Sequence, residues 1–533
     1  MRRAERISGL LLVALVASLP FEFRFFPILS NLQWLFAGVA VLSLPILVRD
    51  RNALLGDRLV LAAMLFVLTQ WLAAFLADDV TVNAVKGAVR VTAGFTLLCV
   101  TLRLGDRPVL MRAWSVSAVL AALYGILDYG GWGAADLFRE GEFYFSGGRR
   151  LSGSFEYPNT AAAFFALSIP VVWTTPRRRW VGLAGALLIW SVLLLTYSRG
   201  AAIAVALVVL GWAASRRSRS AVVAGGVGAA VFIAFLAWMP SLFDRFVEPQ
   251  PVEALSAEYQ PEFNLLRHRP DELDLFTLEV RNTGTATWFP DGDQPVSISF
   301  RWYDQERLER VLVNHPHTRV PRRVEPGESV TIRAVFRTPG EAGAYVLVWD
   351  MARRGDSWFS AVGDPPAVVD AHIDPENEIW YGAGSLRGRH RPENFVEFAG
   401  DIPVSRTDLW RAAAGIALEH PILGRGPDSF RLLHGERLGL ARPNTEIRAN
   451  NLYLELLAGS GLAGLAAFLL MMGTLGWSRT APAIALGVFL IHGLVDTFLM
   501  TTPIYFAFWI LLGVAGRSMN GNCATIQEKM RAG

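Results

Sequence analysis

Apolar stretches of about 16 to 22 residues recur along this chain, each near the length that a lipid bilayer requires of a helix. Of the 533 residues, 52% are hydrophobic and only 18% are charged. An ordinary soluble domain is less apolar, so the sequence predicts a polytopic membrane protein with a soluble portion. The expected spans are 7–20, 30–48, 59–77, 83–102, 109–128, 157–175, 180–196, 200–215, 221–239, 451–473, 481–498 and 503–516.

The arginines of the short loops predict the orientation of these spans. They fall in alternate loops, whereas the opposite short loops carry Asp78 and Asp79 or few charges. Because cytoplasmic loops are enriched in Lys and Arg, both termini are expected in the cytoplasm and the long 240–450 segment outside. The net charge of +3 then reflects these loops, and no nucleic-acid partner is expected. The arginines assigned to the cytoplasmic side are Arg2, Arg3, Arg6, Arg49, Arg51, Arg58, Arg103, Arg107, Arg177, Arg178, Arg179, Arg216, Arg217, Arg219 and Arg479.

These patterns divide the chain into four expected portions. The predicted fold class is an α-helical polytopic protein of the cytoplasmic (inner) membrane, with about twelve spans and an inserted extracytoplasmic β-sandwich. The portions are an N-terminal bundle of about nine spans at 1–240, the sandwich at 258–372, an external helical segment at 400–450 and a C-terminal bundle of about three spans at 451–518.

Short strand-like runs predict the β-sandwich. They alternate with period two, are separated by Asn-Thr-Gly and Pro-Gly turns, and lie at 276–280, 296–302, 330–336 and 345–349. With Trp288, Trp302, Trp349 and Trp358, this region resembles the four-tryptophan type of immunoglobulin-like domain. The tryptophans either fill the core or form an exposed platform for a sugar. His315 and His317 offer too few ligands for a metal site, and no metal or other cofactor is expected.

Polar side chains gather at the external ends of the expected spans, where lipid cannot satisfy their hydrogen bonds. Such positions face a cavity or a partner, so they are the candidates for a functional site. The candidates are Arg150 and Asn159, Ser198 and Arg199, Arg406 and Arg411, Asn450, Asn451 and Glu455, and His492 with Asp496.

Arg199 lies in a turn on the side that otherwise avoids positive charge. The donor fork of a guanidinium suits phosphate oxygens, although interfacial snorkelling of the side chain is the alternative explanation. Lys86 and Arg90, four residues apart, add two cations in the fourth expected span. The structural alternative for Arg90 is a neutralising partner such as Asp128 or Asp496.

His492 and Asp496 are also four residues apart, which would place both on one face of the eleventh expected span. They form either an oriented hydrogen-bonded pair or an ordinary satisfied histidine of a helix bundle. Taken together, external arginines around a membrane-facing cavity indicate a site for a lipid-linked phosphate or pyrophosphate. Its cations would stabilise charge on a diphosphate leaving group.

Five motifs occur in order along the chain. They are Leu151–Thr160, Tyr197–Ala201, the series Arg406, Trp410, Pro421–Pro427 and Phe430, then Asn451–Gly461, and His492–Asp496. In this order they resemble the O-antigen ligase and polymerase family of GT-C-type membrane glycosyltransferases. The resemblance covers both membrane portions and excludes the β-sandwich, which would be an insertion in the family's external loop.

The resemblance implies transfer of a glycan from an undecaprenyl-diphosphate-linked donor to an acceptor hydroxyl, outside the cytoplasmic membrane and without metal. The partners are then this donor, a glycan, lipid or protein acceptor, and membrane lipid. Arginines matching Arg199 and Arg406 would handle the diphosphate. Arg150, Arg90 and Lys86 are further candidates for binding it, and the supporting candidates are Asn159, Ser198, Arg411, His492 and Asp496.

Two positions depart from the family. The family carries a histidine directly before the asparagine that matches Asn451, often with another two residues earlier, where this chain has Asn450 and Arg448. Neither side chain is an ordinary general base. Three explanations remain open. Another group supplies the base, or Asn450 orients the acceptor hydroxyl and positioning with diphosphate stabilisation is enough for the reaction. In the third, the protein is catalytically impaired and acts by binding. The catalytic candidates are Asn450, Asn451, Glu455 and His434, with Glu436 and Glu446 as further bases.

Three functions are consistent with the sequence. The first is a glycan ligase or polymerase in cell-surface polysaccharide biosynthesis, and the sequence leaves these two open because they differ in the acceptor. The second is a transporter or flippase of lipid-linked glycan, for which internal repeats and a midplane site are expected. The third is a non-catalytic membrane protein that binds surface glycan through its sandwich.

Overall fold

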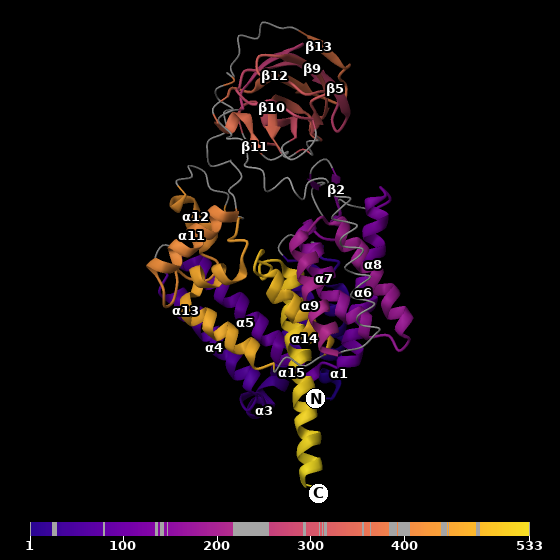
Figure 1. Cartoon of the computed structure of the whole chain (residues 1–533), viewed down its shortest axis with the longest axis vertical. Helices are drawn as coiled ribbons and strands as arrows, with labels where there is room; N and C mark the ends of the chain where they lie inside the picture. Colours follow the sequence, from indigo (N-terminus) through magenta and orange to yellow (C-terminus); the bar gives the residue numbers. More distant parts are fainter. Residues whose placement is uncertain are drawn as a thin grey trace.

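The computed structural model contains a helical portion and a sheet-rich unit inserted between two groups of helices along the chain. Figure 1 shows the sheet-rich unit at one end of the molecule and the helices packed side by side below it, with α11 and α12 in between. The structure describes residues 2–23, 29–77, 80–133, 137–138, 143–145, 148–216, 255–290, 295–308, 310–311, 313, 317–353, 357–362, 364–382, 392, 406–438, 445, 447–475 and 480–531.

Fourteen described helices make up the helical portion. Several begin at a polar capping residue: Ser30 forms a capping box with Gln33, and Asp57, Asp106 and Asn451 accept hydrogen bonds from the first turns of α4, α6 and α13. The helices are α1 (Arg2–Ser18), α2 (Asn31–Arg49), α3 (Arg51–Leu55), α4 (Arg58–Phe75), α5 (Thr81–Leu104), α6 (Arg107–Tyr129), α7 (Pro158–Thr174), α8 (Arg179–Leu195), α9 (Arg199–Arg216), α11 (Arg406–Glu419), α12 (Phe430–Arg437), α13 (Leu452–Gly473), α14 (Ala481–His492) and α15 (Thr502–Arg531).

Five of these helices, α2, α4, α5, α6 and α13, are long and apolar enough to cross a membrane. Shorter apolar helices lie at Arg179–Leu195, Arg199–Val209, Ala481–His492 and Thr502–Gly516. Large apolar side chains such as Val41 and Phe75 are exposed on the outside of the bundle, as expected of a surface that contacts lipid. The chain is therefore a multi-pass membrane protein. The number of twelve spans and the sides of the termini stay predictions, and the expected span at 221–239 lies outside the described residues.

Helices from both ends of the chain pack together. Helix α7 is largely enclosed: its side chains from Thr160 to Val172 are buried, and it contacts α6, α8 and α14. Helix α4 packs on α5 and α13, and α15 packs on α5 and α14. The N-terminal and C-terminal membrane portions therefore form one bundle, which brings their polar residues into one region.

The sheet-rich unit is built from two sheets that share one apolar core. The smaller sheet has the order β3-β5-β9, and the larger has the order β13-β4-β12-β10-β6-β7, with β11 paired to β10 and β8 to β6. The strands predicted from alternation lie within β5, β6, β9 and β10. The strands are β3 (Ala257–Pro261), β4 (Leu265–His268), β5 (Leu273–Asn282), β6 (Val296–Asp304), β7 (Arg310–Val311), β8 (Thr318–Arg319), β9 (Ser329–Arg337), β10 (Gly343–Arg353), β11 (Ser357–Trp358), β12 (Ala367–Ile373) and β13 (Trp380–Gly382).

The four tryptophans of the predicted pattern are buried in this unit, whereas Trp380 on β13 is exposed. Trp288, Trp302 and Trp349 have no exposed surface, and Trp358 is 7% exposed beneath the guanidinium of Arg301. The alternative of an exposed tryptophan platform for a sugar is wrong for these four side chains, because three of them lie in the core shared by the two sheets and Trp358 packs against Ala352 and Arg301. The proposed immunoglobulin-like identity of the unit stays a prediction, and His315 lies outside the described residues.

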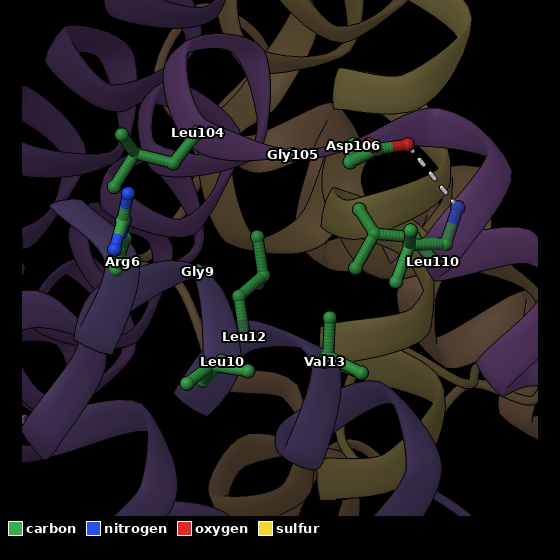
Figure 2. A pocket seen from close by; sticks show the side chains of 10 residues that line it. Arg6, Gly9, Leu10, Leu12, Val13, Leu104, Gly105, Asp106 and Leu110 are labelled. Carbon is green, nitrogen blue, oxygen red and sulfur yellow. Dashed lines mark hydrogen bonds between the residues drawn. The ribbon is translucent and has the colours of Figure 1, made fainter.

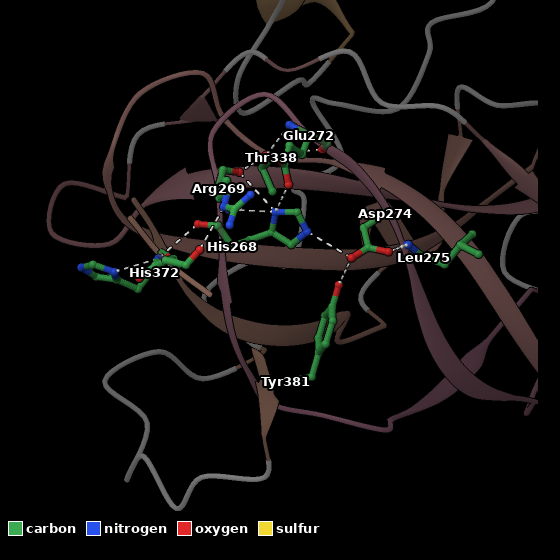
Figure 3. Close-up of polar contacts among 9 residues, drawn as sticks. His268, Arg269, Glu272, Asp274, Leu275, Thr338, His372 and Tyr381 are labelled. Atoms are coloured by element: carbon green, nitrogen blue, oxygen red, sulfur yellow. Dashed lines mark hydrogen bonds and ion pairs between the residues drawn. The ribbon is translucent and has the colours of Figure 1, made fainter. Parts of the chain in front are cut away.

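A polar network fastens the last strand, β13, to the rest of the unit (Figure 3). Buried His268 bonds Asp274 at 3.1 Å, and the Tyr381 hydroxyl donates to the same carboxylate at 2.6 Å. Desolvation raises the pKa of Asp274, but the bonds from Tyr381, the Leu275 N–H and His268 outweigh it and lower the pKa overall. The network therefore ties β4, β5 and β13 together where the chain leaves this unit.

Candidate functional site

The first group of charged residues is the Asp496 cluster, defined as Arg150, Asn159, Asp496 and Arg406. Arg150 ends β2 (Gly148–Arg150) and donates from Nε to the Thr196 carbonyl at 2.9 Å and from a terminal nitrogen to Asn159 Oδ1 at 2.7 Å. Asn159 in turn donates to Asp496 Oδ2 at 3.3 Å. Residues far apart in the sequence are thus joined in one hydrogen-bonded chain.

Arg406 contributes an exposed positive charge to this cluster from the start of α11. It acts electrostatically on both Arg150 and Asp496. Burial lowers the pKa of Arg150 to about 10, with Asp496 raising it and Arg406 lowering it further. Arg150 therefore keeps its positive charge at neutral pH, and two cations face this part of the bundle.

The start of α9 lies beside the same cluster. A Cβ on Gly200 would come within 2.6 Å of Val495 Cγ2 and 3.4 Å of His492 Nε2, so glycine permits the close approach of α9 to α14. This contact holds Arg199, the neighbouring residue, next to the His492–Asp496 segment. The Ser198 carbonyl accepts from the Ala202 N–H as α9 begins.

The expected helical pairing of His492 and Asp496 is wrong. Helix α14 ends at His492, and Asp496 lies in the turn that leads to α15. The reason is that backbone groups of this turn bond the start of α13: the Leu452 N–H donates to Gly493 O at 2.7 Å, and Asn451 Nδ2 donates to Leu494 O at 2.8 Å. Asp496 is consequently aimed at Asn159.

The second group is the Asp428 cluster, defined as Asp428, Arg431, Arg448 and Glu455. Asp428 accepts from Arg431 Nε at 3.0 Å and is also ion-paired with Arg448. Arg431 donates onward to Asn83 Oδ1 at 3.0 Å, which ties α12 to α5. The sequence indicates Asp428 only as a possible cap of the helix after the Pro421–Pro427 turn, and it marks neither Asp428 nor Arg431 as a site residue.

A kink in α13 makes room for the turn that carries Asp428. Gly461 has a φ of +62° inside the helix, and a Cβ there would lie 2.4 Å from the Ile422 carbonyl carbon. Across this contact the Leu462 N–H donates to Pro421 O at 2.8 Å, and the Arg425 N–H donates to Ala458 O at 2.9 Å. The motif glycines therefore dock the 421–427 turn onto α13.

The Asp428 cluster borders a cavity of about 150 Å³, here named the Glu455 cavity. Arg90 is engaged at its wall, because its guanidinium donates to Met500 O at 2.6 Å and lies 4.8 Å from the Tyr505 ring centre. These contacts replace the predicted partners Asp128 and Asp496. The cavity is lined by Phe66, Gln70, Lys86, Gly87, Arg90, Val91, Pro427, Asp428, Glu455, Leu456, Gly459, Ser460, Leu499, Met500, Tyr505 and Trp509.

The two asparagines at the entry to α13 have different surroundings. The Asn451 side chain caps the helix, accepting from the Tyr453 and Leu454 N–H groups at 3.0 and 3.1 Å. Asn450 has a φ of +49°, a conformation that asparagine tolerates better than most residues, and its carbonyl accepts from Trp410 Nε1 at 3.4 Å. Asn451 thus fixes the helix start, while Asn450 lies in sequence between Arg448 and Glu455 of the Asp428 cluster.

Two candidates lie apart from the clusters. His434 is fully buried on α12 and stacks on Phe430 with ring centres 5.5 Å apart, and burial lowers its pKa below the ordinary value. The Arg411 side chain is 76% exposed and pairs with Asp408 at 3.3 Å. In the described residues, groups of His, Cys, Asp or Glu that could hold a metal ion are not found.

An apolar pocket of about 330 Å³ lies elsewhere, between α1 and α6 (Figure 2). Arg6 and Asp106 flank a lining that is otherwise formed by residues such as Leu10, Val13 and Val109. It contains none of the predicted site residues. The candidate functional site is therefore the region of the two charged clusters.

One comparison with known proteins covers part of this region. Residues 374–469 match the family model described as O-Antigen ligase. The matched segment includes α11, α12 and most of α13, which carry Arg406 and the Asp428 cluster. The match supports the O-antigen ligase family and, with it, a membrane glycan ligase or polymerase role in surface polysaccharide synthesis.

Other comparisons add little. No curated protein matches the chain. Among solved structures, the sporulation control protein Spo0M from Bacillus subtilis matches at 14% identity and a TM-score of 0.12, over 31% of this chain and 55% of that one. The alkylpurine DNA glycosylase AlkC from Pseudomonas fluorescens, bound to DNA containing an abasic site analog, matches at 10% identity and a TM-score of 0.17, over 59% and 97%. Such scores carry no argument about fold or function.

Proposed function

We propose that this chain is a membrane glycosyltransferase that moves a glycan from undecaprenyl diphosphate to an acceptor on the external side of the cytoplasmic membrane. The observation that carries the proposal is the gathering of Arg150 and Arg406 around Asp496, beside the start of α9 at Arg199. The family match over 374–469 covers Arg406 and favours glycan transfer over transport.

The chemistry needs a leaving group that departs with negative charge. The acceptor oxygen forms a bond to the anomeric carbon of the donor sugar, and the bond from that carbon to the diphosphate oxygen breaks. Guanidinium groups bind phosphate oxygens in pairs and stabilise the charge that develops on them. In this proposal Arg199 and Arg406 contact the diphosphate. Arg150 adds positive charge to the site without contacting the diphosphate.

The remaining residues of the Asp496 cluster hold these cations in place. The Asp496 carboxylate offsets the positive charge of the arginines. Asn159 links the two, because it donates to Asp496 and accepts a hydrogen bond from Arg150. His492 packs against Gly200 and keeps α9 in register with this segment. We assign these residues, with Ser198 at the start of α9, a positioning role.

The test is the replacement Arg199→Ala at the native locus, with extraction and gel analysis of the surface glycan. We expect the surface glycan to be lost and the lipid-linked precursor to accumulate. Arg437→Ala is the matched control, because this α12 arginine pairs with Glu419 at 2.6 Å outside both clusters. Normal surface glycan in the Arg199→Ala strain would exclude the proposed role of this arginine.

A further inference from the structure

Glycan transfer requires a group that accepts the proton of the acceptor hydroxyl, and the residues at the family's histidine positions do not supply one. Asn450 has no usable basicity and Arg448 stays protonated. Of the other candidates, His434 is fully buried against Phe430 and Glu436 is exposed on α12. Glu446 lies outside the described residues.

Glu455 has the placement that the others lack. It lies one turn inside α13, is 6% exposed, and lines the Glu455 cavity. Its Oε2 accepts from the Ala449 N–H at 2.9 Å, which fixes the carboxylate within one residue of Asn450. Asp428 also lines the cavity, but both of its oxygens are engaged by arginines.

The cavity itself has the character of a binding site for one sugar ring. A cavity of about 150 Å³ holds a single six-membered ring, as an engineered cavity of that size does for benzene. Gln70 Nε2 is buried at its wall without a hydrogen-bond partner among the described residues, so a donor is available for a ligand oxygen. With Lys86 nearby, the lining combines donors and a carboxylate, as recognition of sugar hydroxyls requires.

We propose that the Glu455 cavity holds the sugar ring that bears the acceptor hydroxyl, and that Glu455 takes the proton of that hydroxyl. This inference rests on the proposed function. The hydroxyl oxygen bonds the anomeric carbon of the donor while its proton passes to the Glu455 carboxylate. The bond between that carbon and the diphosphate oxygen breaks, and its electron pair leaves with the diphosphate. Glu455 then releases the proton to water.

The experiment compares Glu455→Gln with wild type in purified full-length protein, using undecaprenyl-diphosphate glycan as donor. Glutamine keeps an oxygen for the Ala449 N–H but accepts no proton. We expect kcat to fall by about 10²–10⁴-fold, the range typical of a general base, while binding of undecaprenyl diphosphate changes less than about twofold. Glu419→Gln, an exposed residue on α11 paired with Arg437, is the matched control.

A second variant guards against a purely structural explanation. Adding Asn450→His to Glu455→Gln places an ordinary base next to Ala449, whose N–H bonds the residue 455 side chain. We expect this double variant to be at least about tenfold faster than Glu455→Gln alone. A full rate in Glu455→Gln overturns the inference while leaving the proposed function intact. Parallel loss of rate and of donor binding also overturns it, because Glu455 would then only support the fold. Failure of the wild-type protein to transfer glycan overturns the proposed function as well.

Discussion

The Asp496 and Asp428 clusters use the same residue types for different arrangements. The Asp496 cluster joins β2, α7 and the turn after α14 in one hydrogen-bonded chain and receives an exposed arginine, Arg406, from α11. The Asp428 cluster ties α12 and α13 to α5 and closes around a cavity. In the function proposed above, the exposed Arg406 contacts the donor diphosphate, while the ion pairs of the Asp428 cluster shape the acceptor pocket.

A large effect is expected from removing the exposed cation of the Asp496 cluster. Arg406→Ala should lower the transfer rate by about 10²–10³-fold, the loss seen when one charge-stabilising donor is removed from an active site. The measurement is the initial rate with lipid-linked donor. Thermal stability should stay unchanged because Arg406 is exposed. A loss of stability with an intact rate would reverse the roles assigned to the two clusters.

The next prediction concerns the stability that the ion pairs of the Asp428 cluster give to the fold. Asp428→Ala leaves Arg431 and Arg448 without their shared carboxylate, which we expect to cost about 1–3 kcal/mol. The measurement is the thermal unfolding midpoint of the purified protein. The control is Asp408→Ala, which breaks an exposed pair with Arg411. Equal midpoints for the two variants would show that the Asp428 pairs do not hold the cavity wall.

A smaller effect is expected at the kink that docks the 421–427 turn. Gly461→Ala places a Cβ against the Ile422 carbonyl at a positive φ, which costs about 1–2 kcal/mol through strain and local displacement. Gly473→Ala is the matched control in the same helix, since a Cβ there meets nothing within 4 Å. Unfolding midpoints should fall for Gly461→Ala alone. Indistinguishable midpoints would mean that the turn does not depend on this kink.

The smallest effect is expected from the sheet-rich unit. Both clusters are built from the helical portions and the segments beside them, so deleting 257–382 should leave the transfer rate within about threefold, below the effect of one lost site donor. The measurement is the rate of the purified deletion variant. A complete loss of transfer, in a variant that still binds the lipid-linked donor, would place part of the acceptor site on this unit.

The sequence named the residues of the Asp496 cluster, but it did not predict how their side chains are arranged. Arg150 and Asn159 fall in one motif and share a hydrogen bond, but His492 and Asp496 lie on a helix end and a turn rather than one helix face. Periodicity could not reveal that the turn's carbonyls bond the start of α13. Such bonds depend on tertiary contacts.

The Asp428 cluster was harder to predict. Its ion pairs and the cavity depend on how α5, the 421–427 turn and α13 meet, and Gln70 lies in an apolar span with no motif to mark it. Three tryptophans of the sheet-rich unit also show that the sequence alone does not reveal tertiary packing. The sequence pattern of Trp288, Trp302 and Trp349 allowed a core or a platform, and only the packing of the two sheets shows that these side chains are buried.

The most direct test of the central claim is glycan transfer by the purified full-length protein. The protein would be incubated with undecaprenyl-diphosphate glycan and candidate acceptors, and both the transferred glycan and the released undecaprenyl diphosphate would be measured. We predict equal amounts of the two products from the wild-type protein and loss of both with Arg199→Ala. Absence of both products from wild-type protein that binds donor and acceptor, or equal yields from the two proteins, would contradict the account.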